Sequence, residues 1–376
     1  MKIVIPKETR LRETRVALTP DTIRGLVKAG FEVAVERGAG ILSFIDDTAY
    51  ADAGASLVSG RDEAYALADI VVKVNAPSTE EIALMKQNAI LISFMYAATN
   101  TELVRACLRR KISGFSMDAI PRISRAQKMD ALSSQANLAG YKAVLLAANA
   151  LGKMLPLMMT AAGTIKPSKV VIMGAGVAGL QAIATAKRLG AMVEVSDIRP
   201  ETKEQIESLG ARFIEIKSDA SVTTEGGYVK EVAEDFLRRQ KELIVEHIRA
   251  ADIVITTALI PGKKAPLLVT REMVKSMRQG SVILDMAVEQ GGNCECSELD
   301  RTVVKHGVTI IGESNLPGLL PRNASELYAR NITAFLMHLV NKDGPAWDLE
   351  EEIAKGSLIT YQGRAMHPSV AQVTAL

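Results

Sequence analysis

Glycines and an acid at a regular spacing stand in the middle of the chain. Gly174, Gly176 and Gly179 have the G-x-G-x-x-G spacing, and Asp197 follows about 20 residues later. These glycines would allow a tight turn, a close approach of backbone to a pyrophosphate, and close packing of a helix on a strand. The free amides at that helix's N-terminus would bind the phosphates, and the carboxylate would accept the ribose hydroxyls. The chemistry indicated is dinucleotide binding.

The surrounding pattern predicts the elements that such a site needs. Residues Lys169–Met173 predict a buried strand, residues 180–190 a helix that ends at a glycine, and Met192–Ser196 a second strand leading to Asp197. A glycine-rich turn without a ligand is the alternative, but the order strand, glycines, helix, strand and acid favours a dinucleotide. Because the carboxylate would repel a 2′-phosphate, we predict NAD(H) rather than NADP(H), although Arg199 would soften that preference.

Length and composition restrict the class of protein. The 376 residues are enough for two domains, and 23% charged with 48% hydrophobic residues is ordinary for an α/β protein. The net charge of +2 gives no reason to expect nucleic acid. Three cysteines are too few for a disulfide framework, and Cys294 and Cys296 are too close together for a zinc knuckle, so we expect no metal. No apolar run approaches the roughly 18 residues of a membrane helix, so we expect no membrane span and a cytoplasmic location.

Two regions of alternating strands and helices predict the fold class: α/β, with two Rossmann-like parallel-sheet domains separated by a cleft and joined by long helices. We expect a discontinuous N-terminal domain, residues 1–126 plus 326–376, and a dinucleotide-binding domain, residues 127–325. The strands expected in the first domain are Lys2–Pro6, Glu32–Glu36, Asp69–Val74, Ala89–Phe94 and Ile112–Ser116, and its helices are Pro20–Ala29, Thr79–Lys86 and Thr101–Arg110. The second domain is expected to have six strands, and helices near 131–151 and from Ser325 onward should join the two domains.

A second polar group precedes the helix near 131–151. Arg122, Gln127 and Asp130 could hold the carboxamide or ribose of a nicotinamide beside the expected cleft. Alternatively, Asp130 is the N-cap of that helix, and Arg122 and Arg125 lie on a solvated loop. The spacing alone leaves both interpretations open.

Long motifs in the chain closely resemble the NAD(H)-binding domain of proton-translocating nicotinamide nucleotide transhydrogenase. The resemblance covers residues 1 to about 340 and is carried by Arg122–Gln135, Met159–Thr164, Gly174–Gly190, Gly226–Tyr228, Thr256–Lys263 and Gly291–Cys294. It implies that a loop at Arg122, Ile123, Ser124, Arg125, Gln127, Asp130 and Ser133 binds the nicotinamide half. It further implies contacts with the rest of the nucleotide from Gly174, Gly176, Val177, Ala178, Gly179, Asp197, Ile198, Arg199, Gly227, Tyr228 and Leu259.

The resemblance also implies an activity and partners. Hydride would pass between NADH on this chain and NADP⁺ on a partner domain, coupled to proton movement through a membrane subunit. Arg122, Gln127 and Asp130 would position the nicotinamide, and no general base is expected. The chain would be a separate subunit or an excised domain, a homodimer, held at the cytoplasmic membrane by its partners.

Two other functions need to be weighed. Alanine dehydrogenase has a similar start, and the resemblance to it makes Arg15 and Lys73 the carboxylate- and carbonyl-binding residues of that enzyme. Tyr96 stands where that family has a histidine. Oxidation of an amine needs a proton acceptor, whereas hydride transfer between two nicotinamides needs none, so the missing histidine favours transhydrogenation. The third possibility is an NAD(H)-binding module without catalytic activity.

A long insert between two strands of the dinucleotide domain predicts a closing loop. Gly226 and Gly227 make the backbone around Tyr228 easy to bend, and a lid is favoured over an idle insertion. We expect NADH to slow amide exchange across residues 219–230. Tyr228→Phe should weaken NADH binding several-fold or less, since one hydrogen bond contributes about 0.5–1.5 kcal/mol. Unchanged exchange in the presence of saturating NADH would contradict a lid.

Overall fold

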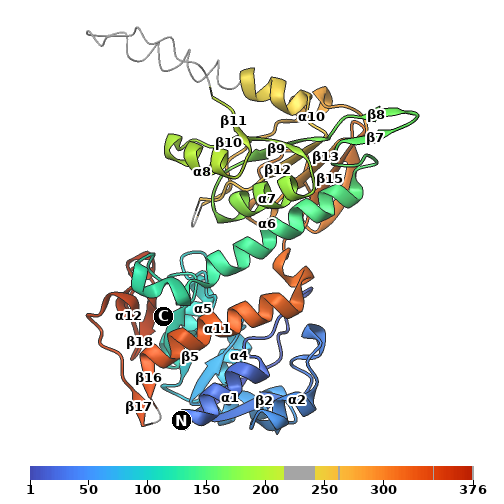
Figure 1. Cartoon of the computed structure of the whole chain (residues 1–376). Coiled ribbons are helices and arrows are strands. Elements are labelled where there is room, and N and C mark those ends of the chain that lie inside the picture. The colour runs from blue at the N-terminus through green and yellow to red at the C-terminus, as the bar shows by residue number, and fades with distance from the viewer. Residues whose placement is uncertain (216–241, 261–262, 342, 375–376) are drawn as a thin grey trace, which may run out of the picture. The chain divides into compact units, whose positions relative to one another are not determined.

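The chain forms two compact units in the computed structural model, which describes residues 1–215, 242–260, 263–341 and 343–374. Unit 1 comprises residues 1–135 and 317–376, and unit 2 comprises residues 136–316 (Figure 1). Helix α6 (Ala131–Ala150) continues from unit 1 into unit 2. Each unit has its own sheet and its own apolar core, so each is considered by itself.

The boundaries expected from the sequence, 126/127 and 325/326, both fall inside unit 1. Ala126, Met129 and Ala131 lie in the apolar core of unit 1, which ties the segment after residue 126 to that unit. On the other side, Thr14 donates a hydrogen bond to the carbonyl oxygen of Gly318, so unit 1 resumes before residue 325. These buried contacts set the division of the chain.

The sheet of unit 1 has the strand order β19-β18-β6-β5-β4-β1-β2-β3. Neighbours from β6 to β3 are parallel, whereas β18 is antiparallel to both β6 and β19. Parallel neighbours require crossover connections, and helices α1 to α5 supply them. The strands are β1 (Lys2–Ile5), β2 (Glu32–Glu36), β3 (Ser56–Val58), β4 (Ile70–Val72), β5 (Ile90–Ser93), β6 (Ser113–Ser116), β18 (Leu358–Tyr361) and β19 (Arg364–Ala365).

Helices cover both faces of this sheet, and the strand residues alternate between two cores. Ile3 and Ile5 face the core that includes Phe335 and Leu339 of α11, whereas Val4 faces the core beneath α3, α4 and α5. A capping box at Ser78 begins α4. The helices are α1 (Pro20–Lys28), α2 (Asp47–Asp52), α3 (Arg61–Leu67), α4 (Thr79–Leu84), α5 (Thr101–Arg109), α11 (Pro321–Leu339) and α12 (Glu352–Ser357).

The sheet of unit 2 has the strand order β11-β10-β9-β12-β13-β15-β14. The first six strands are parallel and have the order of a doubly wound dinucleotide-binding sheet, while β14 is antiparallel to β15. The strands are β9 (Lys169–Met173), β10 (Met192–Ser196), β11 (Arg212–Phe213), β12 (Ile253–Thr256), β13 (Val282–Asp285), β14 (Arg301–Lys305) and β15 (Val308–Gly312). The described helices besides α6 are α7 (Val177–Arg188), α8 (Lys203–Ser208) and α10 (Arg271–Ser276).

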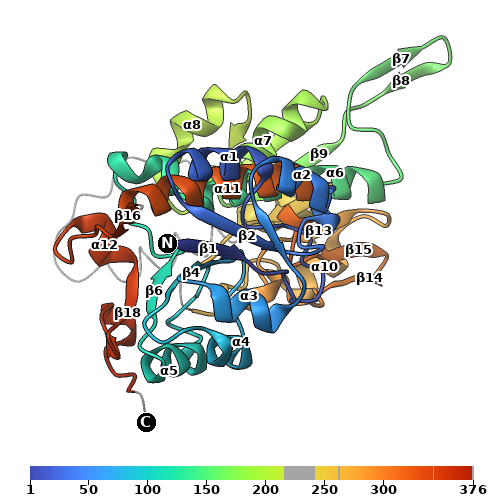
Figure 2. The same cartoon turned by 90° about the horizontal axis from the view of Figure 1, so that it is seen from below.

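The expected fold class is confirmed, since both units are α/β with parallel-rich sheets. Several elements were not expected from the sequence. The short helices α2 and α3, the edge strands β14, β18 and β19, and strand β3 have too few residues to show a clear period. Strands β7 (Met158–Thr160) and β8 (Gly163–Ile165) form a hairpin that extends away from the sheet of unit 2 (Figure 2).

Helices α6 and α7 approach each other closely because one residue has no side chain. A Cβ atom on Gly140 of α6 would lie 2.1 Å from the carbonyl oxygen of Ala178 in α7. We expect Gly140→Ala to lower the free energy of unfolding by about 1–3 kcal/mol, because α6 must move away from α7. Denaturant unfolding measures this loss.

Gly25→Ala is the matched control in a helix. Gly25 lies exposed in α1, and nothing lies within 4 Å of the Cβ it lacks. This change should raise stability by about 0.5–1 kcal/mol, because glycine is a poor helix residue. Equal effects of the two substitutions would show that the close approach at Gly140 does not restrict the helix.

Candidate functional site

The carboxyl ends of neighbouring parallel strands bring the predicted dinucleotide residues to one edge of the unit 2 sheet. Strand β9 ends at Met173, directly before Gly174, and β10 ends at Ser196, directly before Asp197. Strand β12 lies on the other side of β9 and leads towards Leu259. Ligands of open α/β sheets bind beyond such strand ends, where the order of the strands reverses.

The three glycines of the fingerprint have different physical roles. Gly174 has a φ of 108°, and a Cβ there would lie 2.4 Å from the hydroxyl oxygen of Thr257. A Cβ on Gly179 would lie 1.9 Å from the carbonyl oxygen of Gly174, so only glycine lets α7 begin this close to β9. Gly176 is exposed, and open space surrounds its missing Cβ. This open edge, which side chains elsewhere would fill, fits a pyrophosphate.

The first turn of α7 provides hydrogen-bond donors to that edge. Gly176 is the N-cap residue, with no side chain to cap the helix, and Val177 and Ala178 are the first helical residues. The amides of a first helical turn have no partner within the helix, and the helix dipole makes this end positive. The α7 terminus is therefore suited to an anion.

Asp197 lies beside the glycine turn and is almost fully buried, with a side chain that is 5% exposed. Its Oδ2 accepts a hydrogen bond of 2.6 Å from the Ala175 amide, which ties the end of β10 to the turn. Burial alone would raise the pKa of Asp197, but hydrogen bonds from Arg199 and the Ala175 amide outweigh burial and lower that pKa. The group is a carboxylate at neutral pH and can accept ribose hydroxyls.

Arg199 engages Asp197 more fully than its position two residues later suggested. Its Nε lies 3.0 Å from Oδ1, its Nη2 lies 3.0 Å from Oδ2, and its amide donates to Oδ1 over 2.8 Å. With the Ala175 amide, each carboxylate oxygen already has two donors. A ribose must therefore displace the guanidinium. Ile198, between the two charged residues, is exposed.

Thr257 and Asn293 also contribute to this edge, and sequence reasoning assigned them no role. The Thr257 hydroxyl donates to the carbonyl oxygens of Gly174, at 3.1 Å, and Met173, at 3.3 Å. Both residues lie in motifs of the resemblance, Thr256–Lys263 and Gly291–Cys294, which was the available signal. Leu259, which the resemblance assigns to the nicotinamide end, is 49% exposed.

In unit 1 the predicted nicotinamide-binding residues share one short segment before α6. Residues Ser124–Met129 form a 3-10 helix whose Ala126 and Met129 are buried, while Arg122, Ser124 and Gln127 are exposed. Arg125 pairs with Glu351 at 3.4 Å and with Glu352 at 3.7 Å. Buried anchors thus present exposed polar side chains, and Ile123 is half-buried between them.

Asp130 is the N-cap of α6, as one of the two interpretations expected. Its Oδ1 accepts the Ser133 amide at 2.9 Å and its Oδ2 accepts the Ser133 hydroxyl at 2.6 Å. Gly227 and Tyr228 lie outside the described residues, as does the expected lid from residue 219 to residue 230.

A buried ionic network lies elsewhere in unit 1. The guanidinium of Arg15 forms a fork with Glu13, at 2.8 and 2.7 Å, and donates to Gln135. Burial would raise the pKa of Glu13, but the hydrogen bonds from Arg15 outweigh it and lower that pKa to about 2. These charges are fully engaged inside the protein.

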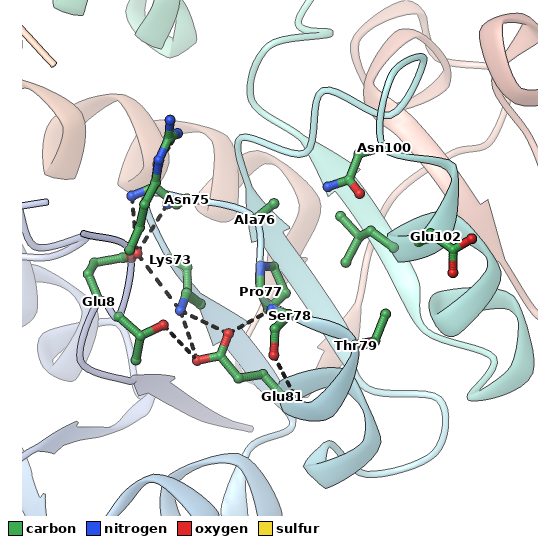
Figure 3. Close-up of a pocket in the computed structure, with 13 residues that line it drawn as sticks. Glu8, Lys73, Asn75, Ala76, Pro77, Ser78, Thr79, Glu81, Asn100 and Glu102 are labelled. Carbon is green, nitrogen blue, oxygen red and sulfur yellow. Dashed lines mark hydrogen bonds and ion pairs between the residues drawn. The ribbon is translucent and has the colours of Figure 1, made fainter. Parts of the chain in front are cut away.

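Lys73 is the centre of the other half of the network. Its side chain is 1% exposed and points toward Glu81, at 3.3 Å, and Glu8, at 3.8 Å (Figure 3). Burial raises the pKa of Glu8 against the opposing effect of Lys73. A cavity of about 330 Å³ opens beside them, lined also by Asn75, Ser78 and Asn100 among others.

Tyr96 lies in a constrained loop of unit 1. Its φ is 46°, its ring stacks on Phe94 at 5.8 Å, and Asp118 accepts the amides of Met95 and Tyr96. The loop therefore holds a phenol at the position where the resemblance to alanine dehydrogenases expects histidine. The described residues contain no group of three His, Cys, Asp or Glu side chains suited to a metal ion.

Comparison with known proteins agrees with this geometry. Residues 4–139 match the family "Alanine dehydrogenase/PNT, N-terminal domain" and residues 143–368 match "Alanine dehydrogenase/PNT, C-terminal domain". The chain is 50% identical to an NAD(P) transhydrogenase subunit alpha protein of Rhodospirillum rubrum, over 98% of this chain and 99% of that protein. It resembles the crystal structure of transhydrogenase from Sinorhizobium meliloti with a TM-score of 0.89 and 44% identity, over 97% and 100% of the chains. A solved L-alanine dehydrogenase has a TM-score of 0.82 and 30% identity, over 99% of both chains.

The fold and the glycine edge together define a two-unit α/β protein with an NAD(H)-binding Rossmann-type domain. The chain belongs to the alanine dehydrogenase/PNT family. The expected resemblance to transhydrogenases is confirmed, and the alanine dehydrogenases are more distant relatives. No helix among the described residues is long and apolar enough to span a bilayer.

Proposed function

We propose that this chain is the NAD(H)-binding component of a proton-translocating transhydrogenase. Hydride passes between NADH bound on this chain and NADP⁺ bound on a partner domain, and membrane subunits couple the transfer to proton movement. The observation that carries the proposal is the edge of unit 2, where a side-chain-free turn, the start of α7 and the Asp197 carboxylate lie together. The 50% identity to a transhydrogenase alpha subunit supports it.

Each part of the nucleotide has residues suited to it. Gly174, Gly176, Val177, Ala178 and Gly179 would bind the pyrophosphate through backbone, without a side chain in the way. Asp197 would accept the adenosine ribose, with Ile198 and Arg199 beside it, and Leu259 would contact the nicotinamide. Gly227 and Tyr228 would close over the nucleotide.

The nicotinamide would be oriented by the segment before α6. Arg122, Gln127 and Asp130 would hold its carboxamide and ribose, with Ser133 supporting Asp130 through two hydrogen bonds. Ile123, Ser124 and Arg125 would complete the segment. Bound NAD(H) supplies the hydride, and the residues of this chain bind it, fix the ring and exclude water. Reaction between two nicotinamides needs the reacting carbons roughly 3–3.5 Å apart and no proton acceptor.

The partners follow from the same proposal. Two chains form a homodimer, which the hairpin β7–β8 supports, because Leu157, Met158, Met159 and Ile165 are exposed and the hairpin pairs with no other described strand. An isolated hairpin is only marginally stable in water, and a second copy would cover its apolar side chains. The membrane subunits hold the dimer at the cytoplasmic face.

Cofactor choice gives the first test. NADH should bind at least about 10-fold more tightly than NADPH, because the 2′-phosphate would meet a buried carboxylate. Asp197→Asn should narrow this ratio by removing the charge, whereas Arg199→Ala should widen it by leaving the carboxylate unpaired. Nicotinamide fluorescence titrations measure the dissociation constants. Equal affinities of the wild-type protein for NADH and NADPH would contradict the assignment of the ribose site.

Hydride transfer gives the second test. Mixed with the NADP(H)-binding partner, the protein should oxidise NADH and reduce NADP⁺. Arg122→Ala and Asp130→Asn should lower the transfer rate about 10-fold or more and change the NADH dissociation constant less than about 3-fold, since they affect orientation. Asparagine is as good an N-cap as aspartate, so Asp130→Asn leaves the start of α6 intact.

Two controls accompany this test. Arg24→Ala removes an exposed arginine paired with Asp21 in α1, and should leave transfer unchanged. Alanine with NAD⁺ should give no NADH, because Tyr96 is a poor proton acceptor near neutral pH. Steady oxidation of alanine would instead support the alanine dehydrogenase-like alternative. Binding of NADH without transfer to the partner would support a non-catalytic module.

A further inference from the structure

The carboxamide of Asn293 joins the two ends of a loop at the nucleotide edge of unit 2. Its Oδ1 accepts the amide of Ala258 at 3.0 Å, and its Nδ2 donates to the carbonyl oxygens of Ala258, at 2.9 Å, and Pro266, at 2.8 Å. The residue is 0% exposed, and both donors and the acceptor of its side chain are used. Ala258 directly precedes Leu259, so this arrangement fixes the backbone from which Leu259 projects.

The position of Asn293 is itself determined by buried polar contacts. Its carbonyl oxygen accepts the amides of Leu268 and Val269, at 2.8 and 2.9 Å. The next residue, Cys294, donates its amide to Asp285 at the end of β13. Gly292 precedes Asn293 with a φ of 79°, and a Cβ there would lie 2.8 Å from Oδ2 of Asp285. The segment can therefore hold the carboxamide in one orientation.

Thr257 fixes the same strand end from the opposite side. Its hydroxyl hydrogen bonds to Gly174 place β12's continuation against the glycine turn. Asn293 and Thr257 thus connect the backbone before Leu259 to two rigid parts of the edge, the segment after β13 and the turn after β9.

We propose that Asn293 and Thr257 are positioning residues for hydride transfer, which act on the nicotinamide through the backbone at Ala258 and the apolar side chains of Leu259 and Ile260. The inference rests on the proposed function, in which Leu259 contacts the nicotinamide. Both side chains of this apolar pair are partly exposed, at 49% and 43%, and are available to a planar ring. A shift of about 1 Å in the floor beneath the ring is sufficient to slow hydride transfer about 100-fold, while the pyrophosphate and adenosine contacts preserve affinity.

Asn293→Ala tests the proposal by removing the three hydrogen bonds. We expect single-turnover hydride transfer with the NADP(H)-binding partner to fall about 10- to 100-fold, with a change in the NADH dissociation constant below about 3-fold. Amide exchange at Ala258 should become at least about 10-fold faster, because that N–H loses its acceptor. The control is Ser281→Ala at the start of β13, where a buried hydroxyl donates to Ala251. It should change neither transfer nor Ala258 exchange.

Thr257 provides an independent pair of variants that keeps the test decisive if Asn293→Ala folds poorly. Thr257→Val removes the hydroxyl and should slow transfer, whereas Thr257→Ser retains it and should restore at least half of the wild-type rate. A parallel loss of transfer and affinity, or slow transfer in Thr257→Ser equal to that in Thr257→Val, would overturn the proposal. Active wild-type protein with unaffected variants would refute this inference alone. Inactive wild-type protein would refute the proposed function, and exchange at Ala258 would still test the hydrogen bonds.

Discussion

The approach of backbone to backbone at the end of β9 is the constraint on which the nucleotide edge depends. Gly179 places the start of α7 against the carbonyl oxygen of Gly174, and Gly140 places α6 against the carbonyl oxygen of Ala178. Asp197 is joined to the same turn through the amide of Ala175. A side chain at either close approach would therefore move the helix amides and the carboxylate relative to each other. Binding of both the pyrophosphate and the ribose depends on this one packing arrangement.

Unit 1 uses its buried charges differently. Arg15 and Lys73 are paired inside the protein, and breaking a buried ion pair costs about 3–5 kcal/mol because the remaining charge has no partner. Their presence therefore does not require that they bind a substrate. Tyr96 points to the same conclusion, because a phenol near neutral pH accepts a proton poorly. The features shared with alanine dehydrogenases fit a structural role, and the absence of histidine at residue 96 fits a reaction without proton transfer.

The sequence predicted the regular parts of the fold and the residue types of the site. Long apolar strands and the glycine fingerprint have clear periods, so β9, α7 and β10 were predicted within a few residues. Short edge strands such as β14 and β18 were not, because their pairing depends on distant residues. The fork between Arg199 and Asp197 and the hydrogen bonds of Asn293 were also missed. Both depend on side-chain geometry or on contacts between residues far apart in sequence, which spacing does not encode. The domain boundaries differed because Met129 and Ala131 are buried in unit 1.

Asp130 shows why structural and functional interpretations of a residue need not exclude each other. Its two oxygens accept the amide and hydroxyl of Ser133, which begins α6 and fixes the carboxylate in one rotamer. Each carboxylate oxygen can accept more than one hydrogen bond, so capping leaves acceptor capacity for a ligand. A group that must orient a nicotinamide has to be held rigidly, and the N-cap supplies that rigidity without a further residue. The two interpretations left open by the spacing are therefore compatible, since the cap is the means by which the carboxylate is aimed.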